Sequence, residues 1–403
     1  MACGIDIIEI SRIQKAVEKN KTFLNRVFSE SEIEYFKKNG ERFEILAGFY
    51  AAKEAFGKHK KTGIRGLELS RISVEHEEQG APFIVFDDKP QGVTLSISHD
   101  KTHAVAVVCG IQQYADAGQD EEMGKLIPKR RDDAHKGSCG RVFVVAGSRG
   151  MTGAAVLAAK GALRCGSGLV TVGTAESERH IVAGHLVEAM TLGLEEKDGI
   201  VSSRAMKKIL KSAYEADAIV FGPGLGKNSE IPEILAELIR SYQGTLVIDA
   251  DGLNALSKNC DMLKGAACKI IITPHPGEMC RLTKRPVEDI QKNREVVALE
   301  FAQKYGVTVV LKGKDTVIAD STGEIRINTT GNCGMATGGM GDVLAGVIAS
   351  FAGQGLGAFD AAVLGAYIHG KAGDIARLQK GIHGMVATDV VEMLPLAIKT
   401  EIE

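Results

Sequence analysis

Apolar and polar positions follow two different patterns along this chain of 403 residues, and the change falls near residue 112. Before it, apolar runs such as GIDIIEI, PFIVFD and AVAVVCG alternate with turns, and helical spacing covers 11–20, 29–40 and 43–58. Strands this close in sequence must pair largely antiparallel, since a parallel pair needs a long crossover. Residues 1–111 are therefore predicted to form an α+β domain.

Capping signals predict where the first helices begin and end. Ser11 precedes Gln14 by three residues and Ser29 precedes Glu32 by three, which is the spacing of a capping box. The Asn-Gly pair at 39–40 supplies residues favoured at a helix end. We therefore expect one helix that starts at Ser11 and a second that runs from Ser29 to this pair.

From residue 124 onward, buried strand runs alternate with helices. RVFVVAG, AIVFGPGLG, TLVIDADG, KIIITPHPGE and VTVVLKG are apolar and end in polar or turn-forming residues. Such strands, separated by helices, predict an α/β domain over 124–403 with a mostly parallel sheet covered by helices. Because these sheets bind ligands beyond the carboxyl ends of their strands, the polar strand ends should surround one site. The acidic stretch 112–123 is predicted to be a linker.

Composition and charge exclude several classes of protein. Hydrophobic residues make up 44% and charged residues 25%, which argues against a disordered or fibrous chain. The net charge of −2 gives no basic excess for nucleic acid. No apolar stretch reaches the length of a membrane span, and the N-terminus lacks the regions of a signal peptide. We therefore expect a cytoplasmic protein without nucleic-acid or membrane partners.

The eight cysteines show no C-x-x-C pair and no zinc-finger spacing with histidine. Scattered cysteines of this kind are typical of reduced thiols in the cytosol, so we expect no disulfide. They are Cys3, Cys109, Cys139, Cys165, Cys260, Cys268, Cys280 and Cys333.

Two acids in the first domain are candidates for a metal site. Asp6 lies in an apolar strand, where a buried carboxylate without a partner is costly, and Glu54 lies among small residues of a helix. Two such acids can hold Mg²⁺ while water and phosphate complete its shell. Lys53 and His99 are candidates for a base and for phosphate contacts. The alternative is that all four residues have only structural roles, in ion pairs or turns.

The order of short motifs in residues 1–111 resembles that of the holo-[acyl-carrier-protein] synthases. The motifs are GIDIIEISRI, FLNRVFSESEIEYF, GFYAAKEAFGK, ISVEHEEQGAPFIV and SISHDKTHAVAVV. The resemblance implies Mg²⁺-dependent transfer of the 4′-phosphopantetheine arm of coenzyme A to a serine of acyl carrier protein. It implies Asp6 and Glu54 as Mg²⁺ ligands, and Lys53 and Glu54 as catalytic groups. It further implies His99 as a coenzyme A contact and a homotrimer with active sites between its subunits.

Basic residues gather on and beside the first predicted helix. Positive charge there suits the steering of an acidic carrier protein, although a solvated basic helix face has the same composition. The segment 57–66 is more basic than the Gly-Thr-Gly turn usual in the resembled family, which leaves its contacts open. The basic residues are Arg12, Lys15, Lys19, Lys21 and Arg26.

Three stretches of the second domain compete as nucleotide loops. GAYIHGKA (365–372) has P-loop spacing without the final hydroxyl or a preceding strand, and is predicted to be helical. GPGLGKN (222–228) follows a strand but lacks the dinucleotide spacing. GMATGGMGDVLAG (334–346) offers bare backbone N–H groups before an apolar helix, where a phosphate oxygen is favoured. Asp342 can instead be the N-cap of that helix, but the density of glycine favours the phosphate site.

This last stretch resembles the loop of the ribokinase-like superfamily that ends in a catalytic aspartate. The motifs GSRGMTGAAVLAAKGALRCGSGLVTV, DADGLNAL, TPHPGEMCRL and VVLKGKDTVI narrow the resemblance to the ADP-dependent NAD(P)H-hydrate dehydratases. It covers 124–403 and implies repair of NADH or NADPH that carries water on the nicotinamide ring. The hydrate hydroxyl would attack the terminal phosphate of ADP, and loss of phosphate would restore the ring.

The resemblance also implies residue roles. Asp342 would be the base that contacts the hydrate, and Gly341 would contact the nucleotide. Asn254 and Glu278 are further candidates, while His275 and Glu278 have a structural alternative as formers of the HPGE turn. The implied binding residues are, for the hydrate, Ala154, Gly226, His275 and Asp342 and, for the AMP portion, Lys312, Gly313, Lys314, Asp315 and Thr316.

Alternative functions are open from the sequence. The second domain can be a small-molecule kinase of the same fold, such as a hydroxymethylpyrimidine or hydroxyethylthiazole kinase. The first domain can serve only to bind a carrier protein or to form oligomers. A chain that binds nucleotides without turnover is the remaining alternative.

Overall fold

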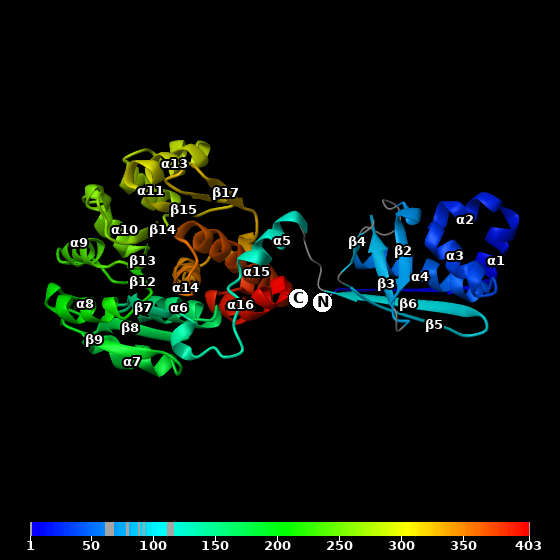
Figure 1. Cartoon of the computed structure of the whole chain (residues 1–403), viewed down its shortest axis with the longest axis horizontal. Helices are drawn as coiled ribbons and strands as arrows, with labels where there is room; N and C mark the ends of the chain where they lie inside the picture. The colour runs from blue at the N-terminus through cyan, green and yellow to red at the C-terminus, as the bar shows by residue number, and fades with distance from the viewer. Residues whose placement is uncertain are drawn as a thin grey trace. The chain divides into compact units, whose positions relative to one another are not determined.

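The computed structural model describes residues 2–60, 68–77, 80–87, 89–91, 93–110 and 117–402. The chain divides into two compact units, 1–116 and 117–403 (Figure 1). Helix α5 (Ala117–Leu126) begins the second unit, so the second part of the expected linker is helical. No helix in the described part of the chain is long and apolar enough to cross a membrane.

The first unit contains two small sheets and a long helix. Its elements are β1 (Ala2–Glu9), α1 (Ile10–Lys19), α2 (Lys21–Val27), α3 (Glu30–Lys38), α4 (Phe43–His59), β2 (Ile72–His76), β3 (Pro82–Phe86), β4 (Lys89–Pro90), β5 (Thr94–His99) and β6 (His103–Gly110). The sheets have the orders β1-β6-β5 and β2-β3-β4, and every pairing is antiparallel, as predicted. Helix α4 packs so closely on β1 that a Cβ atom at Gly4 would overlap the carbonyl of Ala55.

One of the two predicted capping boxes is present. Ser29 caps α3 and forms the reciprocal box with Glu32, and Asn39 ends that helix. The box predicted at Ser11 is wrong, because the chain passes directly from β1 into α1. Glu9 therefore takes the N-cap position, and the hydroxyl of Ser11, inside the first turn, donates a hydrogen bond to the Glu9 carboxylate.

Two cysteines of the first unit form a disulfide, which corrects the expectation of reduced thiols throughout. Cys3 and Cys109 bond to each other although they lie 106 residues apart. They are directly opposite in the β1–β6 ladder, and their Cα atoms are 4.3 Å apart. This spacing is typical of the non-hydrogen-bonded pairs of antiparallel strands, in which side chains lie close together.

The second unit is a helix-covered sheet, as predicted. Its strands are β7 (Arg141–Val145), β8 (Leu169–Ala175), β9 (Met190–Leu194), β10 (Glu196–Lys197), β11 (Ile200–Val201), β12 (Ala218–Phe221), β13 (Thr245–Ile248), β14 (Lys269–Ile272), β15 (Thr308–Leu311), β16 (Thr316–Ala319) and β17 (Ile325–Asn328). After α5, its helices are α6 (Thr152–Arg164), α7 (Arg179–His185), α8 (Met206–Tyr214), α9 (Ile231–Ser241), α10 (Asp251–Leu256), α11 (Pro276–Thr283), α12 (Val287–Lys292), α13 (Arg294–Tyr305), α14 (Met340–Gly353), α15 (Ala358–Gly384) and α16 (Ala387–Ile402).

The main sheet has nine strands in the order β17-β16-β15-β14-β13-β12-β7-β8-β9. All pairings between β9 and β15 are parallel, and only β16 and β17 join antiparallel. Alternate strand residues face opposite sides, so α6, α14, α15 and α16 cover one face and α8, α9, α11 and α13 cover the other (Figure 1). The rejected P-loop stretch 365–372 lies within α15, which confirms its helical prediction.

Glycine positions α14 against its neighbour α6. A Cβ atom at Gly346 would overlap the carbonyl oxygen of Ala158, and one at Gly161 would lie 2.6 Å from that of Val343. The two helix backbones therefore touch, which sets where the N-terminus of α14 emerges.

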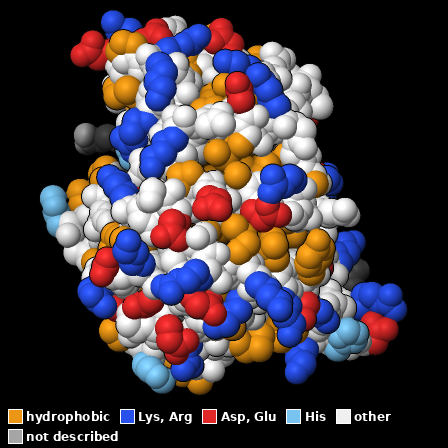
Figure 2. Space-filling view, turned by 90° about the vertical axis from the view of Figure 1, so that its left-hand side faces the viewer, with side chains coloured by type: hydrophobic (Ala, Val, Ile, Leu, Met, Phe, Trp, Pro, Cys, Tyr) orange, Lys and Arg blue, Asp and Glu red, His pale blue; other side chains and the backbone are white. Residues whose placement is uncertain are grey.

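Figure 2 views the left-hand side of Figure 1, and there basic and acidic side chains are interspersed among apolar ones.

Candidate active sites

The candidate residues of the second unit gather at the carboxyl ends of adjacent parallel strands. Asp249 follows β13, Thr273 and His275 follow β14, and Lys312 follows β15. The glycine-rich stretch enters α14 beside them. A Cβ atom at Gly341 would lie 3.1 Å from Nζ of Lys312 and 3.6 Å from Oδ2 of Asp249. The tertiary fold thus brings the strand ends and the glycine-rich turn into one site.

The half-buried Lys312 and the buried Asp249 form an ion pair within this site. Nζ of Lys312 lies 2.7 Å from Oδ1 of Asp249 and 3.8 Å from Oε2 of Glu278. Asp249 is 1% exposed and also accepts a 2.7 Å hydrogen bond from the hydroxyl of Thr273. Burial lowers the pKa of Lys312, but the charges of Asp249 and Glu278 outweigh burial and raise the pKa above its ordinary value. Lys312 is therefore a fixed positive charge.

Asp342 is a carboxyl whose proton affinity suits acid–base chemistry. Burial raises its pKa to about 7, and the charge of Asp249 adds to this effect while that of Lys312 opposes it. Burial likewise raises the pKa of Glu278 to about 6. A base works best when its pKa lies near the operating pH, so Asp342 has the required property.

The alternative role of Asp342 as a helix cap is wrong. Helix α14 has Gly339 at its N-cap, with φ 89° and no side-chain cap. Glycine adopts this left-handed conformation without steric cost, and Met340 is then the first helical residue. Asp342 is the third helical residue, so its carboxyl lies in the first turn beside the site and does not cap the helix.

Two of the four predicted hydrate-binding residues, Ala154 and Gly226, lie where α6 begins and the GPGLG turn passes over it. A Cβ atom at Gly224 would come within 2.9 Å of Cβ of Ala154. Gly226 has φ 79° and donates its N–H to Oδ2 of Asp251 at 2.9 Å. Met151, the N-cap residue of α6, is 41% exposed, and its carbonyl oxygen would lie 2.8 Å from a Cβ atom at Gly224.

His275 and Glu278 form the HPGE turn, as their structural alternative proposed. Nδ1 of His275 accepts a 3.0 Å hydrogen bond from the N–H of Gly277, and the Glu278 carboxylate accepts one of 2.8 Å from the N–H of His275. The His275 side chain is still 52% exposed, and burial lowers its pKa. The side-chain amide of Asn254 donates a 3.1 Å hydrogen bond to the carboxylate of Asp251, which also accepts from Gly226 of the GPGLG turn.

The residues predicted to bind the AMP portion form the turn between β15 and β16. Gly313, Lys314 and Asp315 are exposed, and the hydroxyl of Thr316 donates to the carbonyl of Gly313 at 2.9 Å. Asp315 has φ 54°, a conformation that is uncommon for residues other than glycine. The turn starts at Lys312, so it begins inside the site and leads to the surface.

Asp6 and Glu54 come together where β1 crosses α4 in the first unit. Both carboxylates act on the pKa of Tyr50, which burial raises, and the Tyr50 hydroxyl donates to Glu54 at 3.2 Å. The isoleucines that flank Asp6 point to the other face of the sheet, where Ile5 is 60% and Ile7 65% exposed. Asp6 is therefore directed toward the helix that carries Glu54.

Lys53 lies in the core of the first unit, which contradicts its expected role as a base or phosphate contact. Its side chain is 0% exposed and forms an ion pair with Glu32 at 2.6 Å. It also donates to the carbonyls of Val27 at 2.7 Å and Leu69 at 3.0 Å. An ammonium has three donors, so none is left for a phosphate.

Lys58 is the lysine that lies beside the two acids. Its Nζ is 2.8 Å from Oδ1 of Asp6, and its side chain is 49% exposed. Lys58 was missed, although its spacing of four from Glu54 places both on one side of α4. His99 ends β5, is exposed, and lies on the same face of the sheet as Asp6, with β6 between them.

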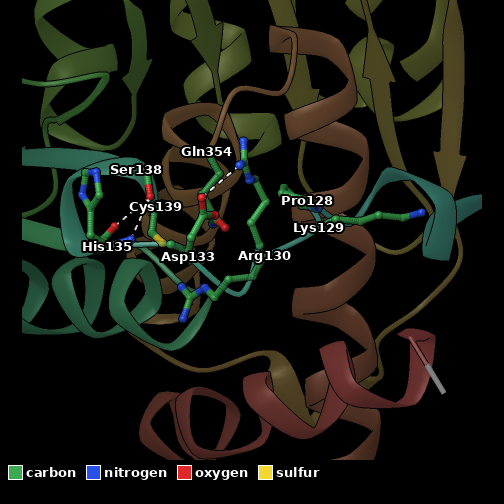
Figure 3. A pocket seen from close by; sticks show the side chains of 10 residues that line it. Pro128, Lys129, Arg130, Asp133, His135, Ser138, Cys139 and Gln354 are labelled. Atoms are coloured by element: carbon green, nitrogen blue, oxygen red, sulfur yellow. Dashed lines mark hydrogen bonds and ion pairs between the residues drawn. The ribbon is translucent and has the colours of Figure 1, made fainter.

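A basic cavity of about 270 Å³ lies just before the amino end of β7, whereas the candidate site lies at the carboxyl ends of the strands; Figure 3 shows its lining side chains. Arg130 donates to the carbonyl of Gly166 at 2.7 Å, and Arg131 pairs with Asp133 at 2.9 Å. Lys129 extends away from the other labelled side chains (Figure 3). The arginines are thus engaged within the protein, and no predicted site residue lies there.

Known proteins are similar to both units. Residues 142–396 match the family model of NAD(P)H-hydrate dehydratase, and residues 2–109 match that of the 4′-phosphopantetheinyl transferase superfamily. The bifunctional NAD(P)H-hydrate repair enzyme Nnr of Moorella thermoacetica is 43% identical over 68% of this chain and 52% of its own length. The chain thus spans about half the length of the first curated relatives it matches.

A shorter relative and a solved structure cover the second unit almost completely. The ADP-dependent (S)-NAD(P)H-hydrate dehydratase of Neisseria meningitidis is 37% identical over 66% of this chain and 87% of its own length. The ADP/ATP-dependent NAD(P)H-hydrate dehydratase of Bacillus subtilis, co-crystallized with ATP/Mg²⁺, is 31% identical with a TM-score of 0.61, over 70% of this chain and 97% of that one. The chain therefore belongs to the NAD(P)H-hydrate dehydratase family, with a domain of the 4′-phosphopantetheinyl transferase superfamily in its N-terminal part.

Proposed function

We propose that the second unit restores hydrated NADH and NADPH in a reaction that consumes ADP. The observation that carries this proposal is the position of Asp342, with a pKa of about 7, in the first turn of α14 beside the charged Lys312. The N–H groups of a first helical turn have no partner within the helix and favour a phosphate oxygen. The names of the relatives in Moorella and Neisseria support the substrate class, and the latter supports ADP.

Asp342 would act as the base for the first step. It takes the proton of the ring hydroxyl, whose oxygen forms a bond to the terminal phosphorus of ADP while the bond to AMP breaks. The N–H groups before and in α14 stabilise the charge on the transferred phosphate. The C–O bond then breaks, phosphate leaves with the electron pair, and loss of a ring proton restores the dihydronicotinamide. Ala154, Gly226 and His275 would hold the hydrate, and 313–316 the AMP portion.

An assay with hydrated NADH tests this proposal directly. We expect recovery of dihydronicotinamide absorbance with ADP, faster than with ATP, and release of AMP and phosphate in equal amounts. Asp342→Asn should abolish the recovery, whereas the exposed Asp360→Asn should not. A phosphorylated hydrate that accumulates without recovery would favour the kinase alternative, and nucleotide binding without either product would favour the binding-only alternative.

We further propose that the first unit transfers the phosphopantetheine arm of coenzyme A to acyl carrier protein. Asp6 and Glu54 fit a Mg²⁺ site, because both carboxylates lie near the Tyr50 hydroxyl and the ammonium of Lys58 at Asp6 is a cation in the same place. No group of three or more candidate ligands exists among the described residues, so phosphate and water would complete the shell. Bound Mg²⁺ would neutralise charge on the pyrophosphate. Lys58, not Lys53, would contact the phosphate.

The same proposal covers the partners of the first unit. His99, exposed on the same sheet face, would contact coenzyme A. The basic residues of α1 and α2 would meet the acidic carrier protein. The exposed Ile5 and Ile7 strip supports a contact between subunits, as a homotrimer requires. Sedimentation of the whole chain would test the trimer.

Mass spectrometry of apo-carrier protein with coenzyme A and Mg²⁺ tests the transfer. We expect a gain of one phosphopantetheine with the wild type and none with an Asp6→Ala, Glu54→Ala double variant. Lys58→Met should reduce the rate strongly, while Lys37→Met, an exposed lysine on α3, serves as the matched control. Absence of the gain with wild type would favour the carrier-binding or oligomerisation alternative.

A further inference from the structure

Lys312 has hydrogen-bonding capacity that the described residues do not use. Its ammonium carries three donors, and among the described residues only the Asp249 carboxylate accepts from it, at 2.7 Å. The Glu278 carboxylate at 3.8 Å is beyond hydrogen-bond length. Lys312 is half-buried at the site, so the unused donors are available to a ligand that enters there.

The ammonium of Lys312 lies beside the first turn of α14. Nζ would lie 3.1 Å from a Cβ atom at Gly341, the second residue of that helix, so any side chain at 341 would crowd the ammonium. The unpaired N–H groups of the first turn open at the same place. A phosphate oxygen that accepts from these groups therefore lies within reach of Nζ.

Asp249 holds the ammonium in this position through their 2.7 Å contact. Its carboxylate is buried and fixed by the hydroxyl of Thr273. The next residue, Ala250, has φ 47° and ψ −113°, a conformation that L residues rarely adopt. This backbone turn sends the chain from β13 into α10 while the Asp249 side chain stays directed at Lys312.

We propose that Asp249 is a positioning residue that holds Lys312 over the first turn of α14, where Lys312 contacts the phosphate being transferred and not the AMP portion. The inference rests on the proposed ADP-dependent reaction and deepens it. When the hydrate oxygen bonds to phosphorus, the bond to AMP breaks and AMP leaves with the electron pair. The ammonium keeps its protons throughout and stabilises the transferred phosphate, first in its transfer and then as it leaves the ring carbon.

A contact with the transferred phosphate predicts a separation of turnover from AMP binding. Lys312→Met should lower kcat by about 100-fold or more, since loss of one such donor typically costs 10²–10³-fold. The inhibition constant of AMP should change by less than about threefold, because AMP lacks the transferred group. Lys269→Met, an exposed lysine at the amino end of β14, should behave as wild type.

A double-variant cycle tests the positioning role of Asp249. Asp249→Asn, assayed well above pH 7 so that Asp342 is ionised in every variant, should lower kcat about tenfold in the wild type and cause little further loss in the Lys312→Met background, because Asp249 then acts through Lys312. Equal losses in both backgrounds would overturn the positioning role. Lys312→Met with weakened AMP inhibition and unchanged kcat would overturn the phosphate contact.

The controls separate this inference from the proposed function. If the wild type shows no ADP-dependent recovery of NADH, the proposed function fails. If the wild type is active and the Lys312 outcomes are reversed, only the inference fails. Should Lys312→Met not fold, judged by circular dichroism and AMP binding, Lys312→Arg gives a second test. It keeps the charge but displaces the compact ammonium, so kcat should fall while AMP inhibition is retained.

Discussion

Replacement of Asp342 by asparagine should stabilise the second unit while it abolishes catalysis. Burial and the charge of Asp249 raise the pKa of Asp342 from 3.8 to about 7 in the folded protein. The folded state therefore binds this proton more tightly than the unfolded state. The stability that this group contributes is fully present below a pH of 3.8 and is lost as the pH rises through about 7.

The size of the effect follows from the raised pKa. A difference of about three between the folded and unfolded pKa values corresponds to about 4 kcal/mol. Lys312 and the other carboxyls readjust when Asp342 loses its charge, so about 2 to 4 kcal/mol is expected. Asparagine cannot ionise. The variant and the wild type should therefore be equally stable near the lower pKa, and the difference should grow to its full size above the folded pKa.

Urea unfolding at several pH values measures this difference in the whole chain. A short pulse of thiol reagent, read by mass spectrometry at the buried Cys165 and Cys268, reports on the second unit alone. Asp360→Asn, an exposed aspartate in the first turn of α15, is the matched control and should change stability little. Equal or lower stability of Asp342→Asn at alkaline pH would show that the Asp342 carboxylate is not destabilised by burial.

Three further substitutions test other features of the molecule. The value of kcat/KM should rise with pH as Asp342 ionises near 7. Glu278→Gln should move the midpoint of this rise to lower pH, because the charge of Glu278 helps to raise the pKa of Asp342. Gly346→Ala should lower the free energy of unfolding by about 2 to 4 kcal/mol, measured in urea, because its Cβ would overlap a backbone carbonyl of α6. Lys53→Met should destabilise the first unit by about 3 to 5 kcal/mol in thermal or urea unfolding, because the buried Glu32 loses its partner. Adding Glu32→Leu should recover most of that loss.

Each of these substitutions has an outcome that contradicts its reasoning. An unchanged or higher midpoint for Glu278→Gln would mean that its charge does not act on Asp342. Unfolding of Gly346→Ala at the wild-type urea concentration would show that α6 and α14 have room to separate. A Lys53→Met, Glu32→Leu variant less stable than Lys53→Met alone would show that the two side chains do not act mainly as an ion pair.

The sequence by itself determined the architecture of both units. Apolar runs and helical spacing depend on neighbours in the chain, so GIDIIEI predicts strand β1 and the spacing over 43–58 predicts helix α4. Strand-helix alternation after residue 124 predicted the parallel sheet, because a parallel pair needs a crossover. The same alternation predicted that the polar strand ends surround one site, since the carboxyl ends of parallel strands share an edge.

Only the tertiary structure decided which groups meet. Lys53 and Lys58 flank Glu54 on one helix, and packing against β1 and the core buries the first and leaves the second at Asp6. Asp249 and Lys312 pair across 63 residues, and this pairing has no signal in either local sequence. The Cys3–Cys109 disulfide and the N-cap of α14 at Gly339 are likewise not predicted by the sequence around them. Local sequence pattern predicts the type and position of each helix and strand. The burial, ion pairing and pKa of a side chain depend instead on residues that only folding brings within a few ångströms.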